Sequence, residues 1–235
     1  MQKIALIIPC YNEELRINEK DIVSVLGSTA ADLFFANDGS TDNTVAVIEK
    51  ICSTYPERCF LLNYEKNQGK AAVIYKSMKL ISEKYSYDYV GYFDADFSTP
   101  PEEIKRLIDI ITASEYKFII GSRILLLNSV IQRKWYRHVI GRVILTLINY
   151  KHKLDIYDTQ CGAKLFSSEI IKEVFNKPFQ TSWLFDTEIF IRLKKLDLLK
   201  TGKEIPLHFW ADYGGSKLNW KSSFKILKEL FIILK

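Results

Sequence analysis

Two aspartates with a single residue between them are the residues of this chain best suited to chemistry. Asp94 and Asp96 directly follow the apolar run Tyr89-Val90-Gly91-Tyr92-Phe93, which is typical of a short buried strand. Residues two apart in an extended chain point to the same side, so both carboxylates would share one face and repel each other. Hard oxygen ligands of this kind suit Mg²⁺ or Mn²⁺, which bind one or two carboxylates together with substrate phosphates. The pattern predicts a divalent-metal clamp, with a solvated Asp-x-Asp turn as the alternative.

Length and composition indicate a globular protein with one core. The chain has 235 residues, of which 48% are hydrophobic and 26% are charged. The apolar run at residues 3–9 is too short, and too soon broken by proline, for a signal peptide or a membrane span. The four cysteines lack CxxC spacing, so we interpret them as reduced thiols. We expect a single domain over residues 1–235, located in the cytoplasm.

Short β-type runs alternate with helical stretches in the first half of the chain. This alternation is typical of βαβ units around a mostly parallel sheet, and it predicts an α/β fold. Strands are expected at residues 3–9, 33–36, 60–63, 89–93 and 117–121. Helices are expected at residues 13–26, 41–55, 70–85 and 101–113.

Polar clusters follow the expected strands. They occupy residues 9–13, 37–42, 67–70 and 94–96. In sheets of this kind, ligands bind outside the carboxyl ends of the strands, at a switch point in strand order. Each cluster alone could be a turn or a helix cap, but their recurrence predicts one shared binding site.

Positive charge is concentrated in the middle of the chain. The formal net charge is +5, and between Glu115 and Asp155 there are eight Lys and Arg residues and no acid. Such a stretch predicts an anionic partner.

Two segments of the second half have the pattern of cationic amphipathic helices. On a helical projection of residues 130–151, one side holds Trp135, Tyr136, Val139, Ile140, Val143, Leu147 and Tyr150. The other side holds Arg133, Lys134, Arg137, His138 and Arg142. The C-terminal segment has Trp220, Phe224, Leu227, Phe231 and Leu234 on one face and Lys221, Lys225, Lys228 and Lys235 on another. The alternative is that both apolar faces pack on the domain, but together the helices favour attachment to an anionic membrane surface.

The sequence gives little indication of a zinc site or a nucleic-acid-binding surface. His138, His152 and His208 are isolated from one another and from a spaced ligand set, which argues against zinc. The aromatic residues lack the basic interleaving of a nucleic-acid platform, so no nucleic-acid partner is expected. The sequence does not predict an oligomeric state.

The strand-end clusters, taken with Gly121-Ser122-Arg123, resemble family 2 glycosyltransferases of the GT-A fold. Residues 158–166, 183–188 and 215–218 resemble more narrowly the dolichyl-phosphate β-glucosyltransferase branch and its polyprenyl-phosphate relatives. The resemblance implies a Rossmann-like, mostly parallel sheet flanked by helices. It also implies a nucleotide-sugar-binding half at residues 1–123 and an acceptor and membrane-facing half at residues 124–235.

The same resemblance implies roles for individual residues. Asp94 and Asp96 would hold Mg²⁺ or Mn²⁺ on the donor diphosphate, Asp38 would contact the uracil ring, and Arg123 would face phosphate oxygens. The nucleotide-sugar pocket would comprise Pro9, Tyr11, Asn12, Glu13, Asp38, Lys70 and Asp94. The acceptor side would comprise Arg123, Gln160, Lys164, Trp183 and Lys217, with the acids Asp186 and Glu188.

The predicted activity is inverting transfer of a hexose, with glucose from UDP-glucose as the expected donor, to a polyprenyl or dolichyl phosphate at the cytosolic membrane face. A lipid phosphate is already anionic and needs no strong general base. Transfer to a hydroxyl of a lipid-linked glycan, in capsule or surface-polysaccharide assembly, would instead need Asp186 or Glu188 as the base. Both acids could equally occupy the first turn of a helix for its dipole.

Two functions of other classes explain less of the sequence. A sugar nucleotidyltransferase needs a glycine-rich phosphate loop after the first strand, and residues 9–13 contain no glycine. A non-catalytic, nucleotide-binding module at the membrane surface would explain the amphipathic helices but not the paired acids.

Overall fold

A mostly parallel sheet forms the centre of the molecule. The computed structural model describes residues 2–212 and 220–235, with side chains from residue 224 in the second range. Within these residues a seven-stranded sheet has the order β3-β2-β1-β4-β7-β5-β8. Its strands are β1 (Ile4–Cys10), β2 (Ala31–Asp38), β3 (Cys59–Tyr64), β4 (Tyr89–Tyr92), β5 (Phe118–Ser122), β7 (Lys164–Ser167) and β8 (Gly202–Pro206). Only β7 runs antiparallel to its neighbours among these strands, and a separate parallel ribbon pairs β6 (Val130–Gln132) with β9 (Phe209–Ala211).

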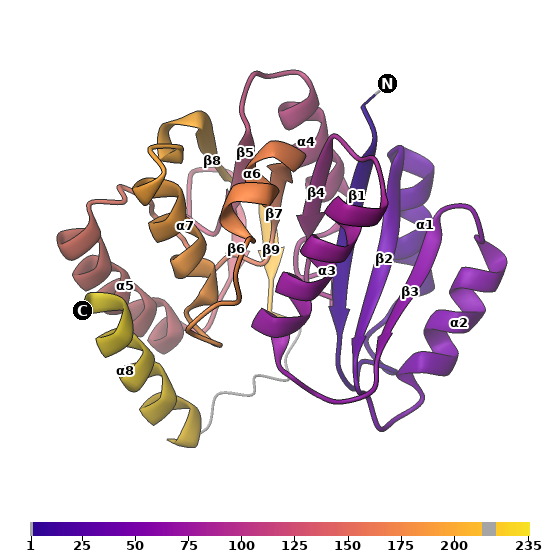
Figure 1. Cartoon of the computed structure of the whole chain (residues 1–235), viewed down its shortest axis with the longest axis horizontal. Helices are drawn as coiled ribbons and strands as arrows, with labels where there is room; N and C mark the ends of the chain where they lie inside the picture. Colours follow the sequence, from indigo (N-terminus) through magenta and orange to yellow (C-terminus); the bar gives the residue numbers. More distant parts are fainter. Residues whose placement is uncertain (1, 213–219) are drawn as a thin grey trace.

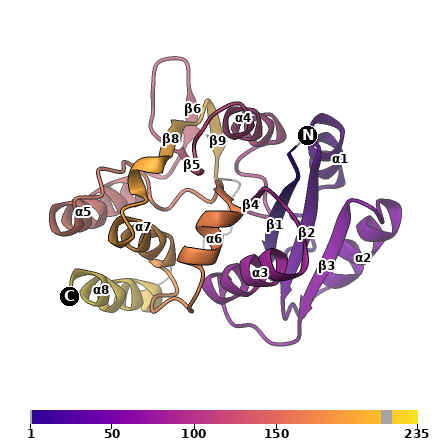
Figure 2. The ribbon, with the colours of Figure 1, turned by 45° about the horizontal axis from the view of Figure 1, so that its top comes forward.

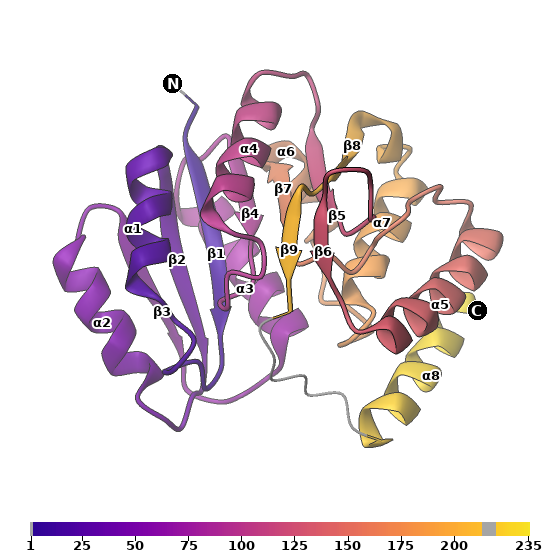
Figure 3. The same cartoon turned by 180° about the vertical axis from the view of Figure 1, so that it is seen from behind.

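Helices cover both faces of the sheet (Figures 1 and 3). One face carries α3 (Lys70–Lys84), α6 (Ser168–Val174) and α7 (Phe185–Lys195). The other carries α1 (Glu19–Ser28), α2 (Thr44–Thr54) and α4 (Pro101–Thr112). A 3₁₀ turn, η1 (Leu199–Thr201), follows α7. Strand β1 serves both cores, because Ala5 and Ile7 face the first and Leu6 and Ile8 the second, which explains its unbroken apolar sequence.

The strand order reverses between β1 and β4. Strands β2 and β3 lie on one side of β1, and β4 with the remaining strands lies on the other. The parallel register pairs Ile7 with Tyr92, so the carboxyl ends of β1 and β4 are adjacent. Asp94 follows directly from this point, where sheets of this kind bind their ligands. The predicted α/β sheet and the strand-end position of Asp94 are therefore confirmed.

The predicted elements of the first half are all present, with shifts at their ends. The helix expected from residue 13 begins at Glu19, because Arg16 and Ile17 instead form a turn with the carbonyl of Glu13. Asn18 then caps α1 by accepting a hydrogen bond from the Lys20 amide. The helix expected from residue 41 begins at Thr44, because the Thr41 amide donates to Asn12 Oδ1.

The prediction of one helix over residues 130–151 is wrong at its start. Val130–Gln132 form strand β6, and the helix α5 runs over Trp135–His152. The partner of β6 is β9, which lies far along the sequence, so local periodicity could not reveal the pairing.

The apolar side of α5 faces outward rather than packing on the domain. Its buried residues are Leu145 and Ile148, whereas Trp135 is 76% exposed. All residues of the predicted apolar side are exposed: Trp135, Tyr136, Val139, Ile140, Val143, Leu147 and Tyr150. The alternative that this face packs on the domain is therefore wrong.

The arginines of α5 turn toward the protein. Arg137 pairs with Asp212 at 2.6 Å, and Arg142 donates to the carbonyl of Tyr157 and stacks over its ring. These contacts hold the basic side of α5 against the body and leave its apolar side exposed.

Helix α8 (Trp220–Leu234) lies beside α5, as Figure 2 shows at the left of the molecule. It buries Ile226, Leu230 and Ile233 and exposes Phe224, Leu227 and Phe231. The predicted positions of the Trp220 and Lys221 side chains lie outside the described residues. No helix in the described part of the chain is both long enough and apolar enough to span a bilayer.

Gly91 in β4 provides a test of the packing between β4 and β7. A Cβ atom at this position would lie 2.5 Å from the carbonyl oxygen of Lys164, a backbone atom that cannot move freely. Gly91→Ala should therefore lower the free energy of unfolding by about 1–3 kcal/mol in urea denaturation. The matched control is Gly27→Ala in α1, where no atom lies within 4 Å of the new Cβ. This control should be neutral or stabilising by up to about 1 kcal/mol, and equal effects of the two variants would contradict the close approach.

Candidate functional site

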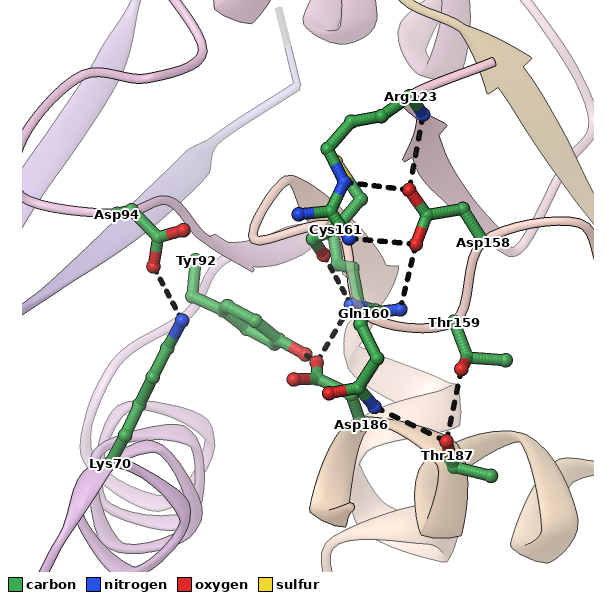
Figure 4. Close-up of polar contacts among 11 residues, drawn as sticks. Lys70, Tyr92, Asp94, Arg123, Asp158, Thr159, Gln160, Cys161, Asp186 and Thr187 are labelled. Atoms are coloured by element: carbon green, nitrogen blue, oxygen red, sulfur yellow. Dashed lines mark hydrogen bonds and ion pairs between the residues drawn. The ribbon is translucent and has the colours of Figure 1, made fainter. Parts of the chain in front are cut away.

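Asp94 lies at the carboxyl end of β4 in an ion pair with Lys70. Lys70 is the first residue of α3, and its Nζ donates to Asp94 Oδ1 (Figure 4). Burial would raise the pKa of Asp94, but the positive charges of Lys70, Arg123 and Lys164 outweigh it, so the pKa lies below its usual value. A Cβ atom at Gly162 would overlap Asp94 Oδ2, so glycine there allows the backbone to pass close to the carboxylate.

Asp96 is held by its own turn and faces an arginine. Its Oδ1 accepts hydrogen bonds from the amide of Ser98 at 3.0 Å and the hydroxyl of Ser98 at 2.7 Å. Its Oδ2 lies 3.7 Å from the guanidinium of Arg16, which pairs with Glu13 at 2.6 Å. Sequence reasoning missed Arg16, although its position three residues after Glu13 was a usable signal.

A second buried cluster surrounds Asp186, at the start of α7. Asp186 Oδ1 accepts a hydrogen bond from Lys164 Nζ at 2.7 Å and another from the hydroxyl of Tyr92. The side chain of Lys164 is 0% exposed and also donates to the carbonyl of Cys161. Burial, together with the negative charge of Asp186, raises the pKa of Tyr92, so its hydroxyl keeps its proton.

Lys70 stands between these two carboxylates. Burial alone would lower its pKa, but Asp94 and then Asp186 outweigh that effect and raise the pKa above its usual value. The site therefore contains alternating charges, in which Asp94, Lys70, Asp186 and Lys164 influence one another.

Arg123, at the end of β5, forks onto Asp158. Its Nε and Nη2 donate to the two carboxylate oxygens at 2.7 and 2.8 Å, and its amide donates to Oδ2 at 3.1 Å. The guanidinium also lies over the ring of Trp210, 5.1 Å from the centroid. Burial would raise the pKa of Asp158, but Arg123 holds it far below its usual range.

The loops expected to form the nucleotide pocket are bound to one another. Asp38 accepts the amides of Gln68 and Gly69, each at 2.8 Å, and thereby fixes the loop that leads to Lys70. Asn12 links the first two loops, since its amide donates to Ser40 Oγ at 3.0 Å. The uracil contact expected of Asp38 stays a prediction, as do the roles of Pro9, Tyr11 and Glu13 in this pocket.

Glu188 belongs to a different group of contacts from Asp186. Its Oε1 pairs with Arg192 at 2.7 Å, and its Oε2 accepts the amides of Gln180 and Thr181. Oε2 therefore fastens residues 180–181 to α7, while Oε1 is held by Arg192 of the same helix.

The remaining acceptor-side residues are spread around the start of α7. Gln160 Nε2 donates to Thr187 Oγ1 at 3.2 Å, and the side chain of Trp183 is partly exposed. Lys217 lies outside the described residues.

The residues present fit a metal ion that is shared with a ligand. In the part of the chain that the structure describes, no three acidic, histidine or cysteine residues group into a protein-only metal cage. Asp94 and Asp96 each use Oδ1 for a protein contact, which leaves few oxygens for an ion. Mg²⁺ and Mn²⁺ accept such sites when phosphate oxygens and waters supply the other ligands.

Comparison with known proteins identifies the family. Residues 5–175 match the family described as Glycosyl transferase family 2. The chain belongs to this family. This glycosyltransferase is 31% identical to a dolichyl-phosphate beta-glucosyltransferase of Saccharomyces cerevisiae, over 98% of this chain and 73% of the yeast protein. It is 27% identical to a dolichol-phosphate mannosyltransferase of Pyrococcus furiosus, over 99% of this chain and 64% of that protein.

Solved structures agree on the fold of this glycosyltransferase. The crystal structure of glucosyl-3-phosphoglycerate synthase from Mycobacterium tuberculosis, with Mn²⁺, UDP and glucosyl-3-phosphoglycerate, aligns with a TM-score of 0.72. The alignment covers 99% of this chain and 78% of that chain at 16% sequence identity. The predicted family and GT-A fold are confirmed.

The Arg123–Asp158 pair predicts a pH-dependent stability difference. Asp158→Asn leaves the buried guanidinium without its counter-charge and should lower the free energy of unfolding by about 3–5 kcal/mol at neutral pH. Because the pKa of Asp158 is lowered by folding, its stabilisation is present above the unfolded pKa of about 4 and is lost as pH falls toward the folded value. The difference between wild type and variant in urea unfolding should therefore shrink below that pH.

The control for this variant is Asp109→Asn, which removes an exposed acid paired with Lys105 on α4. It should change the free energy of unfolding by less than about 1 kcal/mol. A difference for Asp158→Asn that stays constant at acid pH would contradict the lowered pKa.

Proposed function

We propose that this glycosyltransferase moves a hexose, with glucose from UDP-glucose as the first donor to test, to a polyprenyl or dolichyl phosphate. The transfer would invert the anomeric centre and take place at the cytosolic face of a membrane. The observation that carries the proposal is the alternating cluster of Asp94, Lys70, Asp186 and Lys164 at the switch point of the sheet.

The donor half of the proposal rests on the strand-end loops. The hydrogen-bonded loops that contain Asn12, Asp38 and Gly69 would surround the nucleotide. Asp94 and Asp96 would hold Mg²⁺ or Mn²⁺, which, when bound, neutralises charge on the leaving diphosphate. The M. tuberculosis structure with Mn²⁺ and UDP supports this assignment by similarity of fold.

The chain's own cations would stabilise the charge that develops as the sugar leaves. Lys70 would move from Asp94 toward the phosphate oxygens, because its ammonium is held by a single side-chain carboxylate at the edge of the site. Arg123 would keep its position through Asp158 and add fixed positive charge nearby. A cation that is fixed in this way, as Arg123 is, stabilises developing charge without reorganising.

The acceptor half rests on relatives and on the outward faces of α5 and α8. The yeast and Pyrococcus relatives are both named as transferases of dolichyl or dolichol phosphate. The exposed apolar side of α5 supports contact with lipid, and the exposed lysines Lys134, Lys151, Lys225 and Lys228 would face anionic headgroups. A phosphate acceptor also agrees with Asp186, whose Oδ1 already receives two donors.

The first experiment measures transfer of radiolabelled sugar from a panel of UDP- and GDP-sugars to undecaprenyl or dolichyl phosphate. A product that needs Mn²⁺ or Mg²⁺, disappears with EDTA and is acid-labile would support the proposal. Asp94→Asn with Asp96→Asn should abolish it, along with the metal-dependent rise in melting temperature that UDP produces. The matched control is Asp109→Asn with Glu173→Gln, two exposed acids on α4 and α6, which should retain both. An active Asp94/Asp96 double variant would overturn the metal assignment.

A second pair of variants distinguishes the acceptors. With a phosphate acceptor, Asp186→Asn should lower kcat by about tenfold or less, whereas a hydroxyl acceptor that uses Asp186 as base would lose on the order of 10²-fold or more. Glu188→Gln should lower the melting temperature and change kcat little, because Glu188 fastens residues 180–181 to α7. UDP binding without any lipid product would favour a glycan hydroxyl as the acceptor.

A further inference from the structure

Glu229 is a buried acid on the inner side of α8. The residue is 5% exposed, and its carboxylate accepts four hydrogen bonds from residues 182–184. Oε1 accepts the amide of Ser182 at 3.0 Å and its hydroxyl at 2.7 Å. Oε2 accepts the amides of Trp183 at 2.8 Å and Leu184 at 2.9 Å. Burial would raise the pKa of Glu229, but these donors outweigh it and lower the pKa, so the group is ionised at neutral pH.

The four donors precede α7 directly. Leu184 is the N-cap residue of α7, and a negative charge is favourable at the amino end of a helix, so Glu229 stabilises this end of α7 from outside. The next turn carries Asp186, bound to Lys164 and Tyr92, and Thr187, whose hydroxyl lies 2.9 Å from that of Thr159. The placement of residues 182–184 therefore determines where Asp186 stands in the site.

The opposite side of α8 faces away from the protein. Phe224, Leu227 and Phe231 are exposed there, next to the exposed Lys225 and Lys228. One helix thus presents apolar and cationic groups outward and the Glu229 carboxylate inward. Among the α8 side chains that the structure describes, the buried Ile226, Leu230 and Ile233 also hold the helix against the body, and His152 Nε2 lies 2.7 Å from the carbonyl oxygen of Ile233.

The seating of α8 also shapes a neighbouring cavity. A cavity of about 500 Å³ lies between α3, residues 178–182 and α8, and Ala71, Tyr75, Thr181, Lys228 and Glu229 contribute to its lining. Ala71 follows Lys70 in the first turn of α3, so the cavity borders the same helix turn that carries the partner of Asp94.

We propose that Glu229 is a positioning residue, through which the seating of α8 on an anionic lipid surface fixes the start of α7 and so places Asp186. The lipid surface in this inference rests on the proposed function. The position of α8 against the body and the ordered start of α7 depend on the same four hydrogen bonds of Glu229. A surface that binds α8 in this position must therefore also favour the ordered start of α7. Without the carboxylate, the amides of residues 182–184 lose their acceptor. Binding of α8 to lipid then no longer orders the start of α7.

Hydrogen exchange of the amides of residues 182–188 tests this coupling without relying on activity. In wild type, vesicles of phosphatidylcholine and phosphatidylglycerol in equal parts should slow this exchange. Glu229→Gln should speed it by about tenfold in the absence of vesicles and remove the effect of vesicles. Glu229→Asp, which keeps the charge, should restore part of the protection. Glu173→Gln, which removes an exposed acid on α6, should behave as wild type.

Transfer kinetics supply the second readout. Glu229→Gln should lower kcat severalfold while UDP binding with Mn²⁺ stays within about twofold, because the four hydrogen bonds of Glu229 go to residues 182–184 and not to the loops that contain Asn12, Asp38 and Gly69. Added to Asp186→Asn, it should lower kcat little further, since both act through the same group. If Glu229→Gln only destabilised the protein, it would weaken UDP binding as well. The fold-losses of kcat from Glu229→Gln and Asp186→Asn would then multiply in the double variant.

The outcomes separate the two proposals. No sugar transfer to lipid phosphate by wild type would overturn the proposed function, while hydrogen exchange would still decide the role of Glu229. Unchanged exchange in Glu229→Gln, or exchange in wild type that vesicles leave unaltered, would overturn the coupling even if transfer to lipid phosphate is found.

Discussion

Charges that are buried at the edge of this sheet must be balanced within a few ångströms, and the rest of the structure depends on that balance. Removing a carboxylate from water without a partner is strongly unfavourable, so each acid is matched by a cation from another element. Asp94 after β4 meets Lys70 of α3, Asp186 of α7 meets Lys164 of β7, and Asp158 meets Arg123 at the end of β5. Of these pairs, Asp158 with Arg123 joins the first half of the chain, residues 1–123, to the second half, whereas each of the other two lies within one half.

The sequence predicted the strands and helices of the first half well because their signals are local. Asp94 and Asp96 stand directly after an apolar run, and Lys70 directly after a glycine that begins a helix, so strand-end position and residue type could be read together. The parts that were missed depend on contacts between distant segments. Nothing near Lys164 in the sequence reveals that its side chain is fully buried against Asp186, and the donors to Glu229 lie 45 to 47 residues before it.

For helix α5, the helical projection predicted which residues share a side but not which side faces the protein. The projection separated the aromatic side from the basic side correctly, since periodicity is a local property. It could not tell which side faces the protein, and the usual assumption that apolar residues point inward fails here. Arg137 finds Asp212 and Arg142 finds Tyr157, partners supplied by other segments, so the basic side is the one that packs. Arg137 and Arg142, together with the buried Leu145 and Ile148, hold the helix on the body, and its aromatic side is exposed.

The reversed direction of β7 brings the chain back to the edge of the sheet that it left after β5. Because β7 runs against β4 and β5, its first residue, Lys164, sits level with Tyr92 and Ile120, at the edge where those two strands end. The chain therefore departs from this edge after β5 and returns to the same edge to begin β7. The segment between β5 and β7, which includes β6 and α5, therefore begins and ends at the same edge of the sheet. A change in the length of this segment would leave its two end points, and the strands beneath it, in place as long as Asp158 keeps its pair with Arg123.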